Sequence, residues 1–227
     1  MTKLILFDID GTLIKGKNEV PVKSFSVAIK KIFGIDASVD IMLRGHTDKR
    51  IMIEVLNKRG IETEKIIPKL EEMYKIMAEF VRENIKNSSA FVAPGVKELL
   101  EELRSRGYIS GLLTGNLSGV AKVKLENFGL WEFFQVGSFG DTADFREDLV
   151  EEVIKQAEEK FDVKINRKDV FYIGDLPQDI EAGKKAGVKT ISLVGTYTKN
   201  ELMKHEPDYF LDNFSDPKYL ISIIENF

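Results

Sequence analysis

The sequence contains no cysteine, so disulfide bonds, cysteine-ligated zinc, iron–sulfur clusters and thiol nucleophiles are excluded. Histidine is almost as rare. Only His46 and His205 are present, and a histidine-rich metal site or a Ser-His-Asp hydrolase would have to depend on one of them. Any metal binding or phosphate chemistry must therefore rest mainly on carboxylates, of which the chain has 37 in its Asp and Glu residues.

Long apolar runs and an excess of basic charge are also missing. The apolar stretch Leu4–Phe7 is interrupted by Asp8 and Asp10, far short of the ~20 residues of a membrane span and too short for a signal peptide. The 33 Lys and Arg residues leave a formal net charge of −4, whereas nucleic-acid binders usually present a basic face. We therefore expect a cytoplasmic protein with no membrane partner and no nucleic-acid partner.

Near-continuous apolar runs predict buried parallel strands, because helices cover both faces of such sheets. Amphipathic patterns between these runs predict helices, and the alternation from about residue 90 onward indicates an open α/β sheet with right-handed crossovers. The predicted strands are 4–9, 109–114, 133–136, 170–173 and 190–194, and the predicted helices between them are 96–106, 118–128, 147–161 and 178–186.

The stretch from about residue 15 to about residue 90 breaks this alternation, since it shows only helical patterns. The helix expected directly after the first strand appears only at residue 96. We therefore predict an α/β fold: a Rossmann-like open parallel sheet core, 1–14 and 91–227, with an inserted all-helical cap domain, 15–90. The further predicted helices are 22–33, 48–59, 64–85, a short piece within 38–43, and 217–227.

Two aspartates follow the first predicted strand, and strand periodicity places Asp8 and Asp10 on the same side. In open α/β sheets the C-terminal ends of the strands face the ligand. Two like charges this close repel, so the pair needs a cation or a shared proton. The alternative is an ordinary Asp-Gly turn with solvated acids, but two acids directly after four buried apolar residues are costly without a purpose.

A second acidic cluster follows the strand predicted at 170–173. Asp175 comes directly after that strand, and Asp179 opens the next helix, where the helix dipole alone would also favour a carboxylate. Two acidic clusters at strand ends of one sheet indicate a hard-cation site of the Mg²⁺ type, with oxygen ligands only.

Phosphate-binding groups are expected after two other strands. Thr114, Gly115 and Asn116 lie between a strand and a helix, where a hydroxyl and loop amides can hold a phosphate oxygen. The same three residues would also form a good turn and helix entry. Arg146 could balance the carboxylates and the phosphate, unless it is a surface arginine paired with the acidic residues that follow it.

Taken in this order, these elements resemble the haloacid dehalogenase-like hydrolase superfamily. Asp8-Ile9-Asp10-Gly11-Thr12 matches its first motif, DxDG[TV], Thr114 matches its second motif, and the segment from Gly174 to Asp179 matches its fourth, GDxxxD. Its third motif is usually lysine, and Arg146 stands in the corresponding place. The helical insertion after the first motif resembles the subgroup that contains phosphoglycolate phosphatases and β-phosphoglucomutases.

The resemblance implies that Asp8 attacks phosphorus to form an aspartyl-phosphate and that Asp10 acts as general acid and then as general base. It also implies a Mg²⁺ ion held by Asp8, the Asp10 main-chain carbonyl and Asp175, with Asp179 close behind. The groups expected to hold the phosphoryl oxygens are Thr114 and Arg146, with the adjoining Gly115 and Asn116.

In the predicted cap, the segment 43–48 resembles a Gly-x-Thr-Asp element of phosphatases in that subgroup. By this likeness Arg44, His46 and Thr47 are candidate substrate contacts. The alternative for Thr47 and Asp48 is that they cap the helix that follows.

We therefore predict a Mg²⁺-dependent phosphatase, a phosphoric monoester hydrolase that acts on a small phosphorylated metabolite such as phosphoglycolate or a sugar phosphate, as a monomer or homodimer. A phosphomutase of the β-phosphoglucomutase type would use the same residues and is the alternative among enzymes. A non-catalytic phospho-switch is the alternative from another class, although a switch needs neither the cap nor Asp10. Dehalogenation is disfavoured, because dehalogenating relatives need neither Asp10 nor Mg²⁺.

Overall fold

A computed structural model of the chain describes residues 2–17, 19–39 and 45–226. Its centre is a six-stranded parallel sheet with the order β5-β4-β1-β6-β7-β8. The chain builds outward from β1 first to one side and then to the other, so the C-terminal ends of β1, β4 and β6 meet where α/β sheets bind ligands. The strands are β1 (Leu4–Phe7), β4 (Ile109–Leu113), β5 (Val136–Ser138), β6 (Val170–Gly174), β7 (Lys189–Leu193) and β8 (Tyr209–Leu211).

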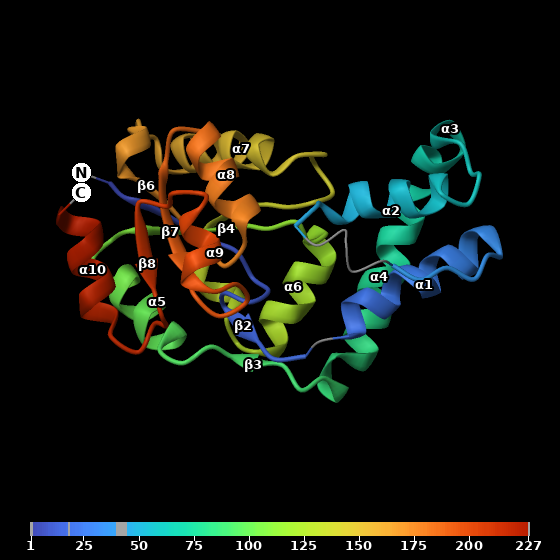
Figure 1. Cartoon of the computed structure of the whole chain (residues 1–227), viewed down its shortest axis with the longest axis horizontal. Helices are drawn as coiled ribbons and strands as arrows, with labels where there is room; N and C mark the ends of the chain where they lie inside the picture. The colour runs from blue at the N-terminus through green and yellow to red at the C-terminus, as the bar shows by residue number, and fades with distance from the viewer. Residues whose placement is uncertain (1, 18, 40–44, 227) are drawn as a thin grey trace.

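Helices cover both faces of the sheet (Figure 1). On one face, α7 (Arg146–Phe161) and α8 (Pro177–Lys185) pack in one apolar cluster with Leu4 and Leu6 of β1. On the other face, the cluster around Ile5 and Phe7 contains side chains of three further helices. Neighbouring residues of β1 are thus buried in opposite layers, which explains the uninterrupted apolar run. The three helices are α5 (Val96–Ser105), α6 (Ser118–Asn127) and α10 (Pro217–Asn226).

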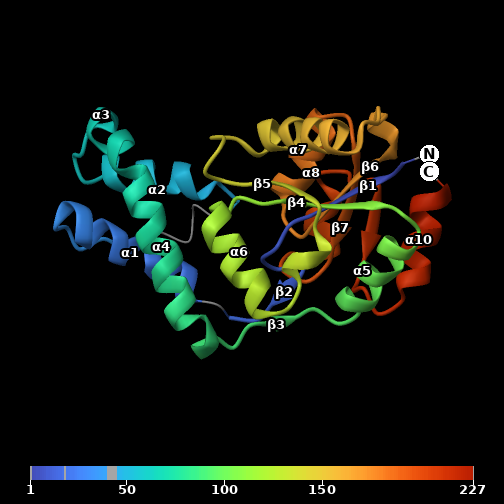
Figure 2. The same cartoon turned by 180° about the vertical axis from the view of Figure 1, so that it is seen from behind.

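The helical cap lies beside the sheet, and α6 lies between the cap and the sheet (Figures 1 and 2). The cap has its own apolar cluster, which also takes in Leu117, Val120 and Val123 from α6 and the turn before it. Ala121 and Leu125 of the same helix belong to the cluster of the sheet. The cap helices are α1 (Glu19–Phe33), α2 (Asp48–Asn57), α3 (Thr63–Ile66) and α4 (Leu70–Asn84).

The two segments that connect the cap to the sheet pair with each other. The strands β2 (Ile14–Lys15) and β3 (Phe91–Val92) form a short antiparallel ladder, visible at the base of the cap in Figure 2. Strands of two residues are too short to produce a detectable periodicity, so the sequence did not predict them.

The structure differs from several predicted boundaries for identifiable reasons. The predicted helix 64–85 is divided into α3, a 3₁₀ turn and α4, because Pro68 in the turn Ile67–Lys69 lacks an amide hydrogen. The strand predicted at 133–136 is displaced to β5, and the aromatic residues before it form a 3₁₀ turn, Trp131–Phe133. Of the short piece predicted within 38–43, residues 38 and 39 are not helical and the rest lies outside the described residues. The sequence also did not predict β8 or α9 (Lys199–Met203).

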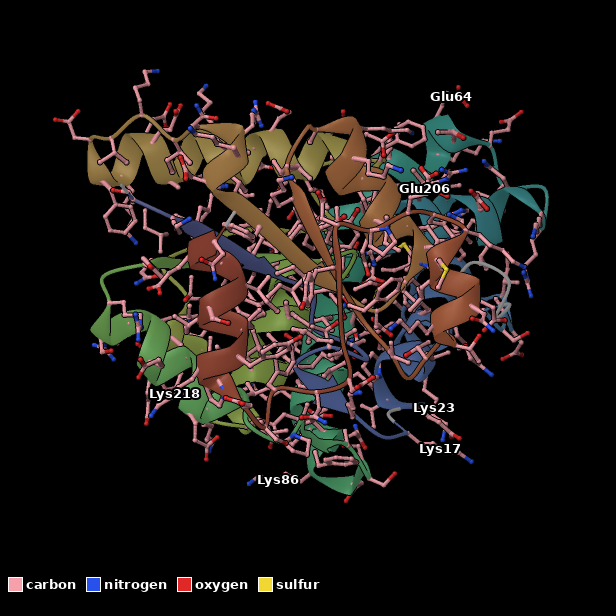
Figure 3. The ribbon with its side chains drawn as sticks, turned by 60° about the vertical axis from the view of Figure 1, so that its left-hand side comes forward. Lys17, Lys23, Glu64, Lys86, Glu206 and Lys218 are labelled. Atoms are coloured by element: carbon pink, nitrogen blue, oxygen red, sulfur yellow. The ribbon has the colours of Figure 1, made fainter. Side chains whose placement is uncertain are left out.

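Most charged side chains point outward into solvent, as the labelled residues in Figure 3 do. Lys124 and Arg146 are exceptions, because both are buried. Within residues 2–17, 19–39 and 45–226, no helix combines the length and the apolar character that crossing a membrane would require.

Candidate active site

Three buried carboxylates meet at the C-terminal ends of β1 and β6. Oxygen atoms of Asp8, Asp175 and Asp179 lie within 4.8 Å of one another, and each residue is at most 2% exposed. Asp8 Oδ1 has no hydrogen-bond partner in the described part of the chain. Together with Arg146, which pairs with two of them, these residues are called the Asp8 cluster below.

Two glycines of the motifs allow these carboxylates to approach the backbone closely. A Cβ atom at Gly11 would lie 2.0 Å from Asp175 Oδ2, and the φ angle of +84° also favours glycine there. A Cβ atom at Gly174 would lie 2.3 Å from Asp179 Oδ2. Larger residues at either position would therefore displace a carboxylate of the cluster.

Arg146 is the first residue of α7 and points into the Asp8 cluster. Its Nη1 atom lies 3.6 Å from Asp8 Oδ1, pairs with Asp179 and donates to the Tyr172 hydroxyl at 3.1 Å. Asp179 is held further by the Tyr172 hydroxyl at 2.7 Å and by the Leu176 amide at 3.0 Å. Arg146 is thus a buried residue of the site and not a surface arginine, and Asp179 anchors its guanidinium.

The Asp8 cluster carries more negative charge than Arg146 can balance. Burial raises the pKa of Asp8 well above its usual range, Arg146 opposes this shift, and Asp179 and Asp175 add to it. Burial raises the pKa of Asp175 to about 7, and Asp179 contributes next. An oxygen-only donor set, in which Asp8 Oδ1 accepts no hydrogen bond from the described residues and carboxylates outnumber cations, fits a Mg²⁺ ion.

Asp10 has different surroundings. Lys124 Nζ lies 2.6 Å from Asp10 Oδ1, the Asn116 side-chain amide donates to Asp10 Oδ2 at 2.8 Å, and Lys124 also donates to Asn116 Oδ1 at 2.9 Å. These three residues are called the Asp10 cluster. Desolvation of the Asp10 carboxylate raises its pKa. The charge of Lys124 and the hydrogen bonds from Lys124 and Asn116 outweigh this effect, so the pKa of Asp10 is lowered overall. The Asp10 side chain nevertheless remains 48% exposed.

The first strand ends earlier than predicted, and the side chains of Asp8 and Asp10 have different partners in the structure, Arg146 and Lys124 respectively. Strand β1 ends at Phe7, and the chain then turns, with the Gly11 amide donating to the Ile14 carbonyl at 2.8 Å. Beyond the end of the strand its periodicity no longer applies, so the two carboxylates reach different partners.

The segment after β4 supplies the predicted hydroxyl. Thr114 is fully buried, and its Oγ1 atom accepts from the Asn116 main-chain amide at 3.3 Å and side-chain amide at 2.9 Å. Because these contacts use the oxygen as acceptor, the hydroxyl hydrogen can be donated to a ligand oxygen. Asn116 therefore links Thr114 to the Asp10 cluster.

The cap touches the core directly beside both clusters. Arg146 Nε donates to the Gly45 carbonyl at 2.9 Å, and the Asp48 amide donates to the Gly115 carbonyl at 2.7 Å. A Cβ atom at Gly115 would lie 2.7 Å from the His46 carbonyl oxygen. Glycine at position 115 therefore permits this close approach of the cap loop.

The three predicted cap residues differ in what the structure says of them. Arg44 lies outside the described residues. Thr47 is the N-cap of α2, and its hydroxyl also donates to the Asp144 carbonyl at 3.3 Å, so both its contacts are internal. His46 Nδ1 lies 3.6 Å from Glu54 Oε1 and has no hydrogen bond within the described ranges. A substrate contact by any of the three stays a prediction.

Lys124 and Tyr172 were not predicted as parts of the site. A signal for Lys124 exists, because it follows Ala121 by three positions and precedes Leu125, which places it on the inward stripe of α6. Tyr172 lies within an apolar strand, and nothing in the sequence distinguishes it from a core residue.

Comparisons with known proteins show which proteins the chain is similar to. A family model described as haloacid dehalogenase-like hydrolase matches residues 5–193. Pyrophosphatase PpaX of Halalkalibacterium halodurans is 27% identical over 217 residues, or 93% of each chain. A phosphoglycolate phosphatase of Aquifex aeolicus is 26% identical over 226 residues, covering 99% of this chain and 97% of its own.

Solved structures show the same fold. A β-phosphoglucomutase of Clostridium difficile superposes with a TM-score of 0.71 at 16% identity, covering 100% of this chain and 98% of its own. CbbY of Rhodobacter sphaeroides, solved in complex with phosphate, has a TM-score of 0.67 at 20% identity, with 95% and 96% of the two chains covered.

Proposed function

Because the chain belongs to the haloacid dehalogenase-like hydrolases, we propose that it is a Mg²⁺-dependent phosphatase that hydrolyses a small phosphorylated metabolite through an aspartyl-phosphate on Asp8. One observation carries the proposal. Three buried carboxylates converge beside a buried arginine, and an oxygen of one of them, Asp8 Oδ1, accepts no hydrogen bond from the described residues. Such a costly arrangement is expected at a site that binds a cation and reacts.

In this proposal Asp8 is the nucleophile, and Arg146 and Thr114 hold the phosphoryl oxygens as their charge redistributes. Mg²⁺ would be held by Asp8, Asp175 and the Asp10 main-chain carbonyl, with Asp179 close behind. It would supply the positive charge that allows a carboxylate to approach a phosphate dianion. Asp179 keeps Arg146 directed at the same place, through the contacts described above.

Asp10 is proposed to protonate the leaving oxygen and later to accept a proton from the water that attacks the aspartyl-phosphate. The geometry supports this role in two ways. About half of the side chain is exposed and can reach a ligand, and the pKa, lowered by Lys124 against the effect of burial, suits the second step, which needs an ionised carboxylate.

The contacts of the cap support a small substrate. Main-chain groups of Gly45 and Asp48 are hydrogen-bonded directly to Arg146 and to the Gly115 carbonyl, both beside the proposed phosphate position. A bulky leaving group would have to separate these contacts, whereas a compact one such as glycolate or a sugar requires less displacement. The names of the relatives, a pyrophosphatase and a phosphoglycolate phosphatase, fit this size class.

The test is release of inorganic phosphate from p-nitrophenyl phosphate, pyrophosphate, phosphoglycolate and a set of sugar phosphates, with Mg²⁺ and with a chelator. We expect Mg²⁺-dependent release that is lost in Asp8→Asn, with a fall in kcat on the order of 10⁴-fold or more. The matched control is Asp36→Asn, which should leave kcat unchanged because Asp36 is an exposed aspartate of the cap.

Three outcomes would contradict the proposal. Full activity of Asp8→Asn with Mg²⁺ would show that Asp8 is not the nucleophile. Isomerisation of a sugar phosphate without phosphate release would indicate a phosphomutase. Stoichiometric phosphorylation without turnover of any substrate would indicate a phospho-switch.

A further inference from the structure

We propose that Lys124 is a positioning residue, which holds the Asp10 carboxylate in the orientation needed for its two proton transfers. This inference rests on the proposed phosphatase function, since it assigns to Asp10 the acid and base steps of that reaction. Lys124 itself exchanges no proton with substrate: the protons pass between Asp10 and the leaving oxygen, and then between water and Asp10.

Each hydrogen of the Lys124 ammonium group has an acceptor within the site. An ammonium group has three hydrogens to donate, and acceptors lie at 2.6 Å and 2.5 Å in the two oxygens of Asp10 and at 2.9 Å in Asn116 Oδ1. Asn116 in turn donates to Asp10 Oδ2 and to Thr114 Oγ1. The carboxylate is therefore held at both oxygens, and its rotation is restricted relative to the hydroxyl proposed to bind phosphate.

Stability alone does not account for a lysine at this position. Lys124 is fully buried on the inward stripe of α6, beside the core residues Ala121 and Leu125. Removing an ammonium group from water is costly, and apolar replacements of buried ion pairs are often neutral or stabilising. An apolar side chain would continue the stripe without that cost, so the ion pair is better explained by what it does to Asp10.

The two members of this ion pair also differ in their exposure to solvent. The Lys124 side chain is 1% exposed, whereas the Asp10 side chain is 48% exposed. The cation therefore holds Asp10 from inside the protein and leaves the other side of the carboxylate open to a ligand. This is the geometry expected of a support for a reacting group, which must be fixed without being covered.

The experiment is a double-mutant cycle on the full-length protein with p-nitrophenyl phosphate and Mg²⁺. Lys124→Met removes the charge at similar length, and we expect kcat to fall on the order of 10²-fold with KM little changed, the effect of misplacing a reacting group. In the Asp10→Asn background the same change should cost less than about threefold, because Lys124 acts through Asp10. Lys122→Met is the matched control: Lys122 lies on the same helix, is exposed, and should be neutral.

Two readouts separate positioning from a merely structural role. Lys124→Arg keeps the charge and donors and should recover part of kcat, and the unfolding midpoint of each variant shows that it is folded. If Lys124→Met does not fold, the cycle is run with Lys124→Gln, which keeps a donor.

The inference is overturned if Lys124→Met retains the wild-type kcat, or if it costs the same factor with and without Asp10. In either case wild-type turnover and its loss in Asp8→Asn would leave the phosphatase function standing. Absence of any wild-type turnover would instead overturn both proposals.

Discussion

Asp8 and Asp10 stand two residues apart in the chain, yet their surroundings are opposite in character. In the Asp8 cluster three carboxylates face one arginine, and burial with too little opposing charge raises the pKa of Asp8. In the Asp10 cluster one carboxylate faces one lysine, which lowers the pKa of Asp10 against the effect of burial. The first cluster has an excess of carboxylates over cations, whereas the charges of the second are balanced.

One sequence motif thus provides two kinds of carboxylate. A group that must bind a cation benefits from surplus negative charge around it, whereas a group that must accept a proton from water benefits from a fixed cation that keeps it ionised. The division follows from packing: Asp8 faces α7 and α8 through Arg146 and Asp179, whereas Asp10 faces α6 through Lys124.

The largest effect is expected when each of the two carboxylates is removed in turn and the covalent state that accumulates is measured. With p-nitrophenyl phosphate, whose leaving group needs little protonation, Asp10→Asn should form the aspartyl-phosphate and then hydrolyse it on the order of 10²-fold or more slowly, because no base activates water. Asp8→Asn should form no phosphoprotein at all. Intact-protein mass spectrometry after mixing measures both; equal labelling of the two variants would contradict the division of roles.

Replacing Asp175 by asparagine removes one negative charge from the Asp8 cluster. Asp175→Asn should weaken Mg²⁺ affinity on the order of 10-fold or more, measured by calorimetry, because an ionised ligand is lost. In metal-free protein it should raise the free energy of unfolding by about 1 kcal/mol at neutral pH, because one of three repelling carboxylates is neutralised.

The sign of this effect follows from the pKa of Asp175. Burial raises it to about 7, so between an ordinary aspartate pKa and about 7 the folded state binds more protons than the unfolded state. The associated stability is present at low pH and is lost as pH rises towards 7. Asp175→Asn should remove that part of the pH dependence, and Asp36→Asn should not. A metal-free Asp175→Asn variant less stable than wild type at neutral pH would contradict the surplus of charge.

The sequence predicted the Asp8 cluster better than the Asp10 cluster. Asp8, Asp175 and Arg146 each lie just after a strand or at the start of the next helix, so strand-end position alone brings them to one edge of the sheet. The partner of Asp10 depends instead on the rotation of α6 about its axis and on where β1 ends. Neither is visible in the apolar pattern, since one lysine in an inward stripe is easily taken for an exposed residue.

The same limit applies to the cap. Its helices could be predicted from their spacing, but the contact of its loop with the core could not, because main-chain hydrogen bonds leave no trace in residue type. Asp48 makes a further contact of this loop with the core, through its side chain. It begins α2, and its carboxylate accepts a hydrogen bond from the Leu117 amide at the start of α6, at 2.9 Å, across the boundary between cap and core.

This contact gives the smallest of the expected effects, and it links the cap to the Asp10 cluster. Burial raises the pKa of Asp48 to about 7; the Leu117 amide and Lys124 oppose the shift, and Asp10 and Asp141 add to it. A raised carboxyl pKa in the folded state means that stability is present below the ordinary aspartate pKa and is lost as pH rises towards 7. The contact between cap and core through Asp48 should therefore weaken as pH rises towards 7.

Asp48→Asn keeps an acceptor for the Leu117 amide and removes the charge. We expect the wild type to lose about 1 kcal/mol of unfolding free energy relative to Asp48→Asn as pH rises from about 6 to about 8, measured by urea titration without metal. Lys124→Met should enlarge this loss, because the cation that opposes the shift of Asp48 is gone. If the unfolding free energies of the wild type and Asp48→Asn change in parallel with pH, Asp48 is solvated and the charges around Asp10 do not affect the stability of the cap.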